Sequence, residues 1–485
     1  MSNPDRTSSF PSGLSALSLS TAYCMVAICT LNAILVLYLT QQLHVHDQDA
    51  YAFFATYSAL FYSASLLGGF LGGRFSHRNI ACLGGILATL GLLLVATSAQ
   101  LGSLSLGLSC LIIGSGYFVP NVYCAIGQIY AYGDSKRDSG FTIAYVAMNV
   151  GGFVGAAASG FLTHHFGYNS IFILIAGFSL LATLTYRRGL RHCAFHDETP
   201  YKRQLAHANT QQQGYLPGLI VAIILLPLLY WLLNHSYFSN ILLIVATALA
   251  LGGILGLSFR ETTIVRYKIW IFLLLCFVSI GFWSLYMLAP SALQLFIERN
   301  VRRQYFGMTI PTASFYSLNP LFIILIGPLL SVLWLALSKR QMAITAASKF
   351  AIGLFLMGLG YLIFIPAIGT ANVIGKISAG WVVLTYAFQA TAELLIGPIG
   401  NAMVGRLAPP KLEGLMMGYF QLNIGVSGAI SSYLAFGTTN LSGATNPLLT
   451  NPIYRDAFGH YGLVTVLLGI ILLLFLRPLN RLIRT

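Results

Sequence analysis

Long apolar runs, separated by short polar segments, repeat along the whole chain. A run of about 20 residues, folded as a helix, crosses the ~30 Å hydrocarbon core of a bilayer. The first run is too long for a cleaved signal peptide, and thirteen more follow it. The pattern therefore predicts an all-α polytopic membrane protein with 14 transmembrane helices. We expect these spans near residues 15–40, 51–73, 79–98, 103–127, 140–163, 170–187, 215–234, 239–259, 267–292, 315–338, 344–367, 377–404, 413–436 and 459–476.

The predicted spans are arranged as six, two and six. Two six-helix bundles around a central site are common in secondary transporters. The two middle spans contain no charge at membrane depth, so we expect a peripheral hairpin packed against lipid. The expected division is an N-terminal bundle at 1–187, a cytoplasmic linker at 188–214, an inserted hairpin at 215–260 and a C-terminal bundle at 261–485.

Composition and charge agree with a membrane protein. The chain is 57% hydrophobic and 8% charged, with a mean hydropathy of +0.77 and a net charge of +14. If the N-terminus is cytoplasmic, 21 of the 26 Lys and Arg residues fall inside. This bias predicts a multi-pass protein of the cell's inner membrane with both termini cytoplasmic. The positive charge then reflects topology, and no basic–aromatic patch indicates nucleic-acid binding.

The sequence lacks the motifs of several kinds of functional site. The seven cysteines show neither metal-ligand spacing nor a disulfide framework. No GxxxxGK[ST] stretch is present, which disfavours an ATP-driven pump. No nucleophile–base pair or metal cluster lies at membrane depth, so we expect no enzyme, no metal and no cofactor beyond a proton gradient. The expected partners are the lipid bilayer and a small solute, and we expect a monomer.

One acidic residue breaks the pattern. Eleven of the 12 Asp and Glu residues lie in loops or at span ends, whereas Glu393 lies deep inside a span. A charge there costs about 2.5–3.5 kcal/mol on insertion scales, and no basic residue lies deep in another span to pair with it. Either Glu393 is protonated for part of a cycle, or it receives a positive charge such as a substrate ammonium group. A permanently protonated, hydrogen-bonded glutamic acid is the structural alternative.

The residues around Glu393 resemble a known signature. The stretch "AELLIGPIGNAMVGRLAPPKLEGLMMGYF" (392–420) is similar to the GELxxSPxGLxxxxKLAPxxxxGLMMGxWF motif of the proton-dependent oligopeptide transporter family. "GSGYFVPN" (114–121) resembles GxGxFKPN, and "RDSGFTIAYVAMNVG" resembles the RDxGFxxxYxxINxG block. "FWSLYMLAPSALQLFIERN" and "SFYSLNPLF" resemble the seventh and eighth helices of the family, and the likeness extends from about residue 11 to 476.

The resemblance implies a major-facilitator fold, in which two six-helix bundles rock around a central site. It also implies uptake of di- and tripeptides with protons, and two extra helices between the bundles in many bacterial members. Glu393 would bind the amino terminus of the peptide and take part in proton coupling. The other substrate-binding positions implied by the motifs are Tyr62, Tyr145, Asn149, Trp283, Asn319 and Phe420, with Phe420 standing where the family has tryptophan.

The chain departs from the family where charges are expected. The first-helix motif ExxERFxYY is absent, and its two glutamates, arginine and two tyrosines are replaced by Thr21, Cys24, Met25, Ile28 and Cys29. Asn32 replaces a further arginine that contacts the carboxyl end of the substrate, and Val119 replaces a lysine. Because both signs of charge are lost together, no orphan buried charge remains.

These features lead to one main hypothesis and two alternatives. We expect a secondary active transporter of the oligopeptide-transporter type, which moves di- or tripeptides or related amine-bearing solutes with altered or weakened proton coupling. The runner-up is an uncoupled facilitator or exporter of a non-peptide solute. A membrane sensor that binds without transporting is the third hypothesis.

Overall fold

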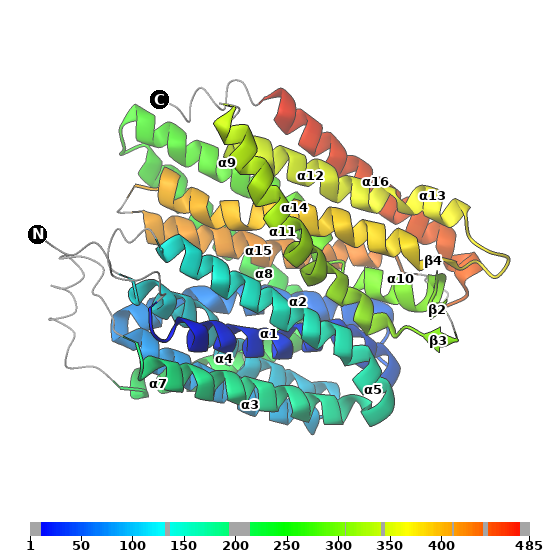
Figure 1. The fold of residues 1–485 in the computed structure, drawn as a ribbon, viewed down its shortest axis with the longest axis horizontal. Coiled ribbons are helices and arrows are strands. Elements are labelled where there is room, and N and C mark those ends of the chain that lie inside the picture. The colour runs from blue at the N-terminus through cyan, green and yellow to red at the C-terminus, as the bar shows by residue number, and fades with distance from the viewer. Residues whose placement is uncertain are drawn as a thin grey trace, which may run out of the picture.

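The helices of the chain run roughly side by side in two groups (Figure 1). The computed structural model describes residues 11–130, 136–193, 214–305, 307–340, 345–409, 412–439 and 445–475. The first group contains α1 (Leu14–Leu37), η1 (Tyr38–Gln42), α2 (Asp47–Leu71), η2 (Gly72–Ser76), α3 (His77–Ala96), α4 (Leu101–Gln128) and α5 (Arg137–Leu190). The last group contains α9 (Thr263–Tyr286), α10 (Ala292–Asn300), η3 (Thr312–Ser317), α11 (Leu318–Lys339), α12 (Ala346–Leu362), α13 (Phe364–Gly369), α14 (Ala379–Leu407), α15 (Glu413–Phe436) and α16 (Pro447–Leu474).

The lengths of the helices fit the expected membrane spans. Eleven helical segments of the described residues are long and apolar enough to cross a bilayer. Two of them, Asp47–Ala96 and Ser139–Leu190, have 50 and 52 residues and are therefore long enough to cross twice. With α15 as a further helix, the described part of the chain accounts for the 14 predicted spans. The all-α membrane fold is confirmed.

Two spans predicted as separate helices, 140–163 and 170–187, are joined directly within α5. Only Gly167 departs from helical backbone angles, with φ 76° and ψ 167°. A positive φ of this size suits glycine, which has no Cβ to clash with the backbone. A single glycine therefore replaces the loop expected between these spans.

The span predicted at 267–292 is interrupted. Helix α9 ends at Tyr286, and the short helix α10 begins at Ala292. The apolar side of α10 is buried, and the Phe296 ring lies 5.0, 4.8 and 5.7 Å from those of Phe364, Tyr454 and Phe458. This aromatic contact fixes α10 to the last helix group.

Short strands mark one end of the molecule. Strand β1 (Val301–Arg302) pairs in parallel with β4 (Ile377–Ser378), and β2 (Gln304–Tyr305) pairs antiparallel with β3 (Met308–Thr309). We call this the strand end, and it lies at the right of Figure 1. Helix α1 begins and α16 ends toward the opposite, terminus end.

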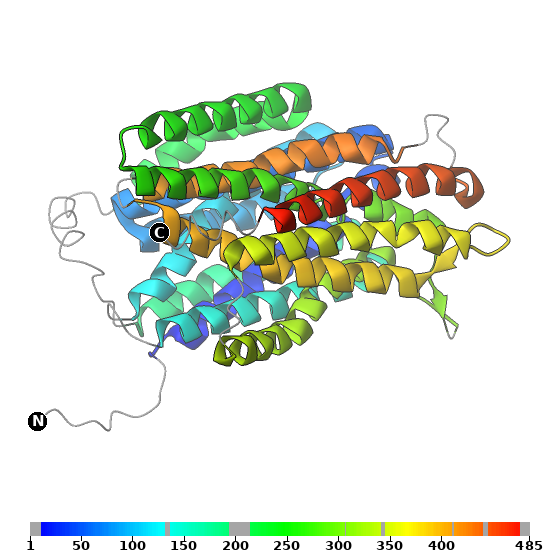
Figure 2. The same ribbon diagram turned by 90° about the horizontal axis from the view of Figure 1, so that it is seen from above.

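The inserted hairpin consists of α7 (Leu216–Asn234) and α8 (Ser236–Ser258). The Tyr117 hydroxyl of α4 donates a 3.2 Å hydrogen bond to the Gly218 carbonyl of α7. Trp270 of α9 donates a 3.1 Å hydrogen bond to Ser258 of α8. The hairpin therefore contacts both helix groups, and Figure 2 shows it in green along one edge of the molecule. Most of its outward side chains are exposed apolar residues, as expected for a surface facing lipid.

Small residues allow the helices to approach closely. At Gly68 of α2, an added Cβ would lie 1.9 Å from the carbonyl oxygen of Gly116 in α4. Contact between backbones is a principal source of helix association in membranes, where lipid is as apolar as the side chains. The glycine-rich stretch at 66–73 therefore serves helix packing at this position.

Candidate functional site

Glu393 lies in the middle of α14 and faces the first helix group. Its side chain is half-buried. The side-chain amide of Asn319, at the start of α11, donates a 2.9 Å hydrogen bond to Glu393 Oε2. The Tyr286 hydroxyl, at the end of α9, also interacts with this carboxyl group. Glu393 is thus held by side chains of two other helices of the last group, α9 and α11.

Four tyrosines and a cysteine lie near this carboxylate. They are close enough for the charge of Glu393 to reach them, and they are Tyr62 of α2, Tyr145 of α5, Tyr286 of α9, Tyr316 of η3 and Cys29 of α1. These five side chains are half-buried and so keep some accessible surface. We call the set the Glu393 cluster: Cys29, Tyr62, Tyr145, Tyr286, Tyr316, Asn319 and Glu393.

Both helix groups contribute to the cluster. Cys29, Tyr62 and Tyr145 come from the first group, whereas the other members come from the last. Within the described residues, no lysine, arginine or histidine takes part in the electrostatic interactions of these side chains. In the part of the chain that the structure describes, the cluster therefore presents one carboxyl group near phenol side chains and no cationic partner.

The structure brings four of the predicted site residues together: Glu393, Asn319, Tyr62 and Tyr145. Asn149 lies beside them, because its amide donates a 2.9 Å hydrogen bond to the Tyr145 carbonyl one turn earlier. Trp283 is buried one turn before Tyr286, and the two ring centroids lie 5.4 Å apart. Trp283 thus packs behind the cluster.

Two further predicted site residues, Asn32 and Phe420, lie outside the Glu393 cluster. Asn32 follows Cys29 by one turn of α1, and its Oδ1 atom is buried without a hydrogen-bond partner among the described residues. Phe420 is buried, and its ring lies against Gly400, where an added Cβ would be 2.3 Å from Phe420 Cζ. Gly400 is seven residues after Glu393, or about 10 Å further along the helix axis. Phe420 therefore packs on α14 at a different level from the carboxylate.

Sequence reasoning missed Tyr286, Tyr316 and Cys29 as members of the cluster. Tyr286 follows Trp283 by three residues, and Tyr316 precedes Asn319 by three. Residues three apart lie on one face of a helix, so this spacing was a usable signal for both tyrosines. Cys29 was identified only as a departure from the family motif, and nothing in its residue type indicates proximity to a carboxylate.

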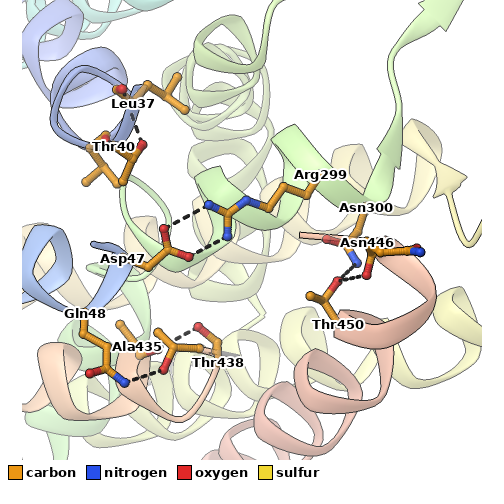
Figure 3. A network of polar contacts seen from close by, with 12 residues as sticks. Leu37, Thr40, Asp47, Gln48, Arg299, Asn300, Ala435, Thr438, Asn446 and Thr450 are labelled. Carbon is orange, nitrogen blue, oxygen red and sulfur yellow. Dashed lines mark hydrogen bonds and ion pairs between the residues drawn. The ribbon is translucent and has the colours of Figure 1, made fainter. Parts of the chain in front are cut away.

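Side-chain contacts between the two helix groups close the strand end. Arg299 of α10 forms an ion pair with Asp47 of α2 through two N–O contacts of 2.5 and 2.9 Å. Figure 3 shows this pair beside Gln48, whose amide donates a 3.1 Å hydrogen bond to Thr439. Deeper in the molecule, Gln294 donates a 2.8 Å hydrogen bond to the Ala33 carbonyl. These contacts hold α10 and α15 against the first group.

Helix α10, which carries Arg299, is held in place by hydrogen bonds to α16. Asn300, the last residue of α10, donates a 2.8 Å hydrogen bond to Thr450 of α16 (Figure 3) and a 2.9 Å hydrogen bond to Asn451. Burial alone would lower the pKa of Arg299, but the ion pair with Asp47 raises that pKa above its ordinary value. Arg299 therefore stays cationic at any physiological pH, held in place by the last group while it binds the first.

Comparison with known proteins gives a consistent result. A family model described as PTR2, POT family, matches residues 78–448. Dipeptide and tripeptide permease A of Chromobacterium violaceum is 30% identical over 465 residues, which cover 93% of this chain and 90% of that protein. Dipeptide and tripeptide permease B of Yersinia enterocolitica is 28% identical and covers 94% of this chain and 92% of the relative.

Solved structures show the same fold. A peptide transporter POT in complex with sulfate superposes with a TM-score of 0.81 at 25% identity, covering 99% of this chain and 97% of that one. The structure of PepTSo2, described as tetrameric, has a TM-score of 0.81 at 24% identity and covers 97% of this chain and 98% of that one.

Among the described residues, no group of three or more His, Cys, Asp or Glu side chains could hold a metal ion.

Proposed function

The chain belongs to the POT family, and from this premise we propose that Glu393 binds the ammonium group of a di- or tripeptide or a related amine-bearing solute. The protein is a secondary transporter of the oligopeptide-transporter type and not an enzyme. Transport would proceed by alternating access, with the two helix groups separating in turn at the strand end and at the terminus end. The position of Glu393 at the interface between the groups is the observation that carries this proposal.

The chemistry of the cluster suits a cation. A carboxylate attracts an ammonium group directly, and the faces of tyrosine rings attract cations through their quadrupole, by about 0.5–2 kcal/mol each. Asn319 and Tyr286 are the side chains that hydrogen-bond to the carboxylate among the described residues, and both are neutral groups that leave its charge uncompensated. A positively charged guest would thus compensate the one charge at this depth.

The missing cations restrict the substrate. A zwitterionic peptide carries a carboxylate that needs a positive partner, and the cluster supplies none within the described residues. Asn32, with an unpartnered carbonyl oxygen and an amide, is a weak replacement for a guanidinium. We therefore expect a preference for solutes whose carboxyl end is blocked or absent.

Proton coupling is a separate question. Glu393 can alternate between a proton and an ammonium group, which in principle suffices for symport. An uncoupled facilitator or exporter is the competing function, and it is favoured by the loss of the first-helix charges, whose positions are taken by Thr21, Cys24 and Met25. Flux measured in liposomes with and without an imposed pH gradient distinguishes the two, while binding without flux identifies a sensor.

The setting of the protein follows from the same reasoning. We propose an inner-membrane location with both termini cytoplasmic, which places the strand end outside. We also propose the division into two bundles (1–187 and 261–485), a linker (188–214) and a hairpin (215–260). A monomer is the proposed functional unit, because one chain supplies every member of the Glu393 cluster.

Substitution of Glu393 provides the decisive experiment. In liposomes, Glu393→Gln should abolish uptake of a dipeptide amide, because a neutral amide cannot compensate an ammonium group. Glu261→Gln, in the turn between α8 and α9, is the matched control and should transport normally. In the parent protein the dipeptide amide should compete with labelled substrate at least as well as the free acid. Normal uptake by Glu393→Gln, or a strong preference for the free acid, would refute the proposal.

A further inference from the structure

A hollow lies at the strand end, lined by residues other than those of the Glu393 cluster. It has a volume of about 650 Å³, within the range of small-molecule sites. One wall comes from the first helix group and includes Gln41 of η1 and residues 160–168 of α5. The other comes from the last group and includes Glu298 of α10 and residues 308–313. We call it the strand-end cavity.

Glu298, the one carboxylate among the described residues that line this cavity, already has partners within the protein. Arg303 donates a 2.8 Å hydrogen bond to Glu298 Oε1, and the Thr312 hydroxyl donates one to Glu298 Oε2. The Tyr168 hydroxyl donates a 2.9 Å hydrogen bond to the side-chain oxygen of Gln41. The principal acceptors in the wall are therefore engaged within the protein.

The groups that remain available are mainly donors. The Gln41 amide nitrogen and the Nε atom of Arg303 make no hydrogen bond among the described residues. His164 and His165 are exposed, stand edge to face with ring centroids 5.3 Å apart, and offer at least one N–H each. Four donor-bearing side chains from both walls thus face a hollow that lacks a free carboxylate.

We propose that the strand-end cavity binds a small oxyanion, a carboxylate or phosphate, through Gln41, His164, His165 and Arg303. A guanidinium and imidazoles are suited to this ligand, because their N–H groups match oxygen acceptors. The ionisable side chains that line the cavity are His164, His165 and Tyr168 from α5, Glu298 from α10 and Arg303 from the following segment, and Glu298 forms an ion pair with Arg303.

Occupation of this cavity stabilises the closed strand end. Its walls meet where Ser314 donates a 2.8 Å hydrogen bond to the Ala157 carbonyl, and where Pro311 lies against Gly160. Separation of the two groups at this end would pull the walls apart and dismantle the site. A ligand that binds only the closed form shifts the equilibrium by a factor of 1 + [L]/Kd, or about elevenfold at ten times the Kd.

Binding is tested on the purified full-length protein with inorganic phosphate as the probe, and with potassium chloride at matched ionic strength as the salt control. Phosphate should raise the unfolding temperature of the parent protein. The His164→Ala/His165→Ala double variant should raise the phosphate Kd by at least about tenfold, since a hydrogen bond to a charged group accounts for about that factor. Gln41→Ala should weaken binding to a lesser degree, and His192→Ala, at the terminus end, is the matched control.

The outcomes separate this site from the proposed substrate site. Retention of the phosphate effect in Glu393→Gln supports the strand-end cavity, whereas its loss there would place the anion at the Glu393 cluster and overturn the proposal. An equal effect in the histidine double variant would also overturn it, as would stabilisation by short-chain phosphatidylglycerol but not by phosphate. In liposomes, phosphate should slow uptake by the parent up to about tenfold without displacing bound substrate. That inhibition should be lost in the double variant.

Discussion

The ion pair between Asp47 and Arg299 is predicted to hold the strand end closed, and its contribution can be calculated from its geometry. Two charge-assisted hydrogen bonds of 2.5 and 2.9 Å join the side chains, which are 26% and 20% exposed respectively. Exposed pairs contribute about 0.2–1 kcal/mol, and hydrogen bonds to charged groups about 1.5–3 kcal/mol. For this partly exposed bidentate pair we take about 1.5 kcal/mol, a factor of about ten in the opening equilibrium.

Cys29 offers a native reporter for opening. Its half-buried thiol belongs to the Glu393 cluster, so a membrane-impermeant thiol reagent supplied at the strand end reaches it only when that end opens. Asp47→Ala and Arg299→Ala should each increase the rate of Cys29 labelling about tenfold. Cys29→Ser in the same backgrounds measures labelling of the other cysteines and is subtracted.

A double-mutant cycle completes the test. If the pair acts as a unit, Asp47→Ala/Arg299→Ala should label no faster than either single variant. The charge-reversed variant, Asp47→Arg/Arg299→Asp, should return the rate toward that of the parent. Rates that multiply in the double variant, or a parental rate in both single variants, would refute the idea that this contact controls opening.

Three further predictions address the cluster and the helix packing. Asn319→Ala removes the donor to Glu393 and should raise the KM for an amine substrate about tenfold, because a hydrogen bond to a charged group contributes about 1.5–3 kcal/mol; an unchanged KM would contradict this. Gly68→Ala places a Cβ against the backbone of α4 and should destabilise the protein by about 1–3 kcal/mol or more, whereas Gly73→Ala, with nothing within 4 Å, should leave the unfolding temperature unchanged. Phe420→Trp enlarges a ring already in contact with α14 and should lower the unfolding temperature, and a stabilised variant would show that space remains there.

Hydrophobic pattern alone predicted the helices because the bilayer imposes a length on every span. The predicted helix boundaries were wrong where a helix breaks or bends without any change in hydropathy. The break between Tyr286 and Ala292 lies inside a continuous apolar run and was therefore read as one helix. In α5 the opposite error occurs: two predicted spans are joined at Gly167 without the loop expected between them.

The site was partly predictable for a related reason. Glu393 was conspicuous because a charge at membrane depth is expensive, and Asn319 because an unpaired buried amide is costly. By contrast, Asp47 and Arg299 are 252 residues apart, and both look like ordinary residues at span ends. Their pairing depends on how two helix groups meet, which no local pattern in the sequence records.

The composition of the Glu393 cluster explains why the charged residues of the family's first-helix motif can be absent together. Cys29 stands where the family has a tyrosine and lies within electrostatic reach of Glu393, where it packs as a small apolar side chain. Removing both signs of charge from α1 avoids the penalty of an unpaired partner, whereas removing Glu393 as well would leave nothing to attract a cation. The remaining carboxylate can be neutralised in only two ways from outside, by a proton or by a cationic solute. Competition between those two ligands at a single group couples their movements without any network in α1, so a loss of the first-helix charges need not imply a loss of transport.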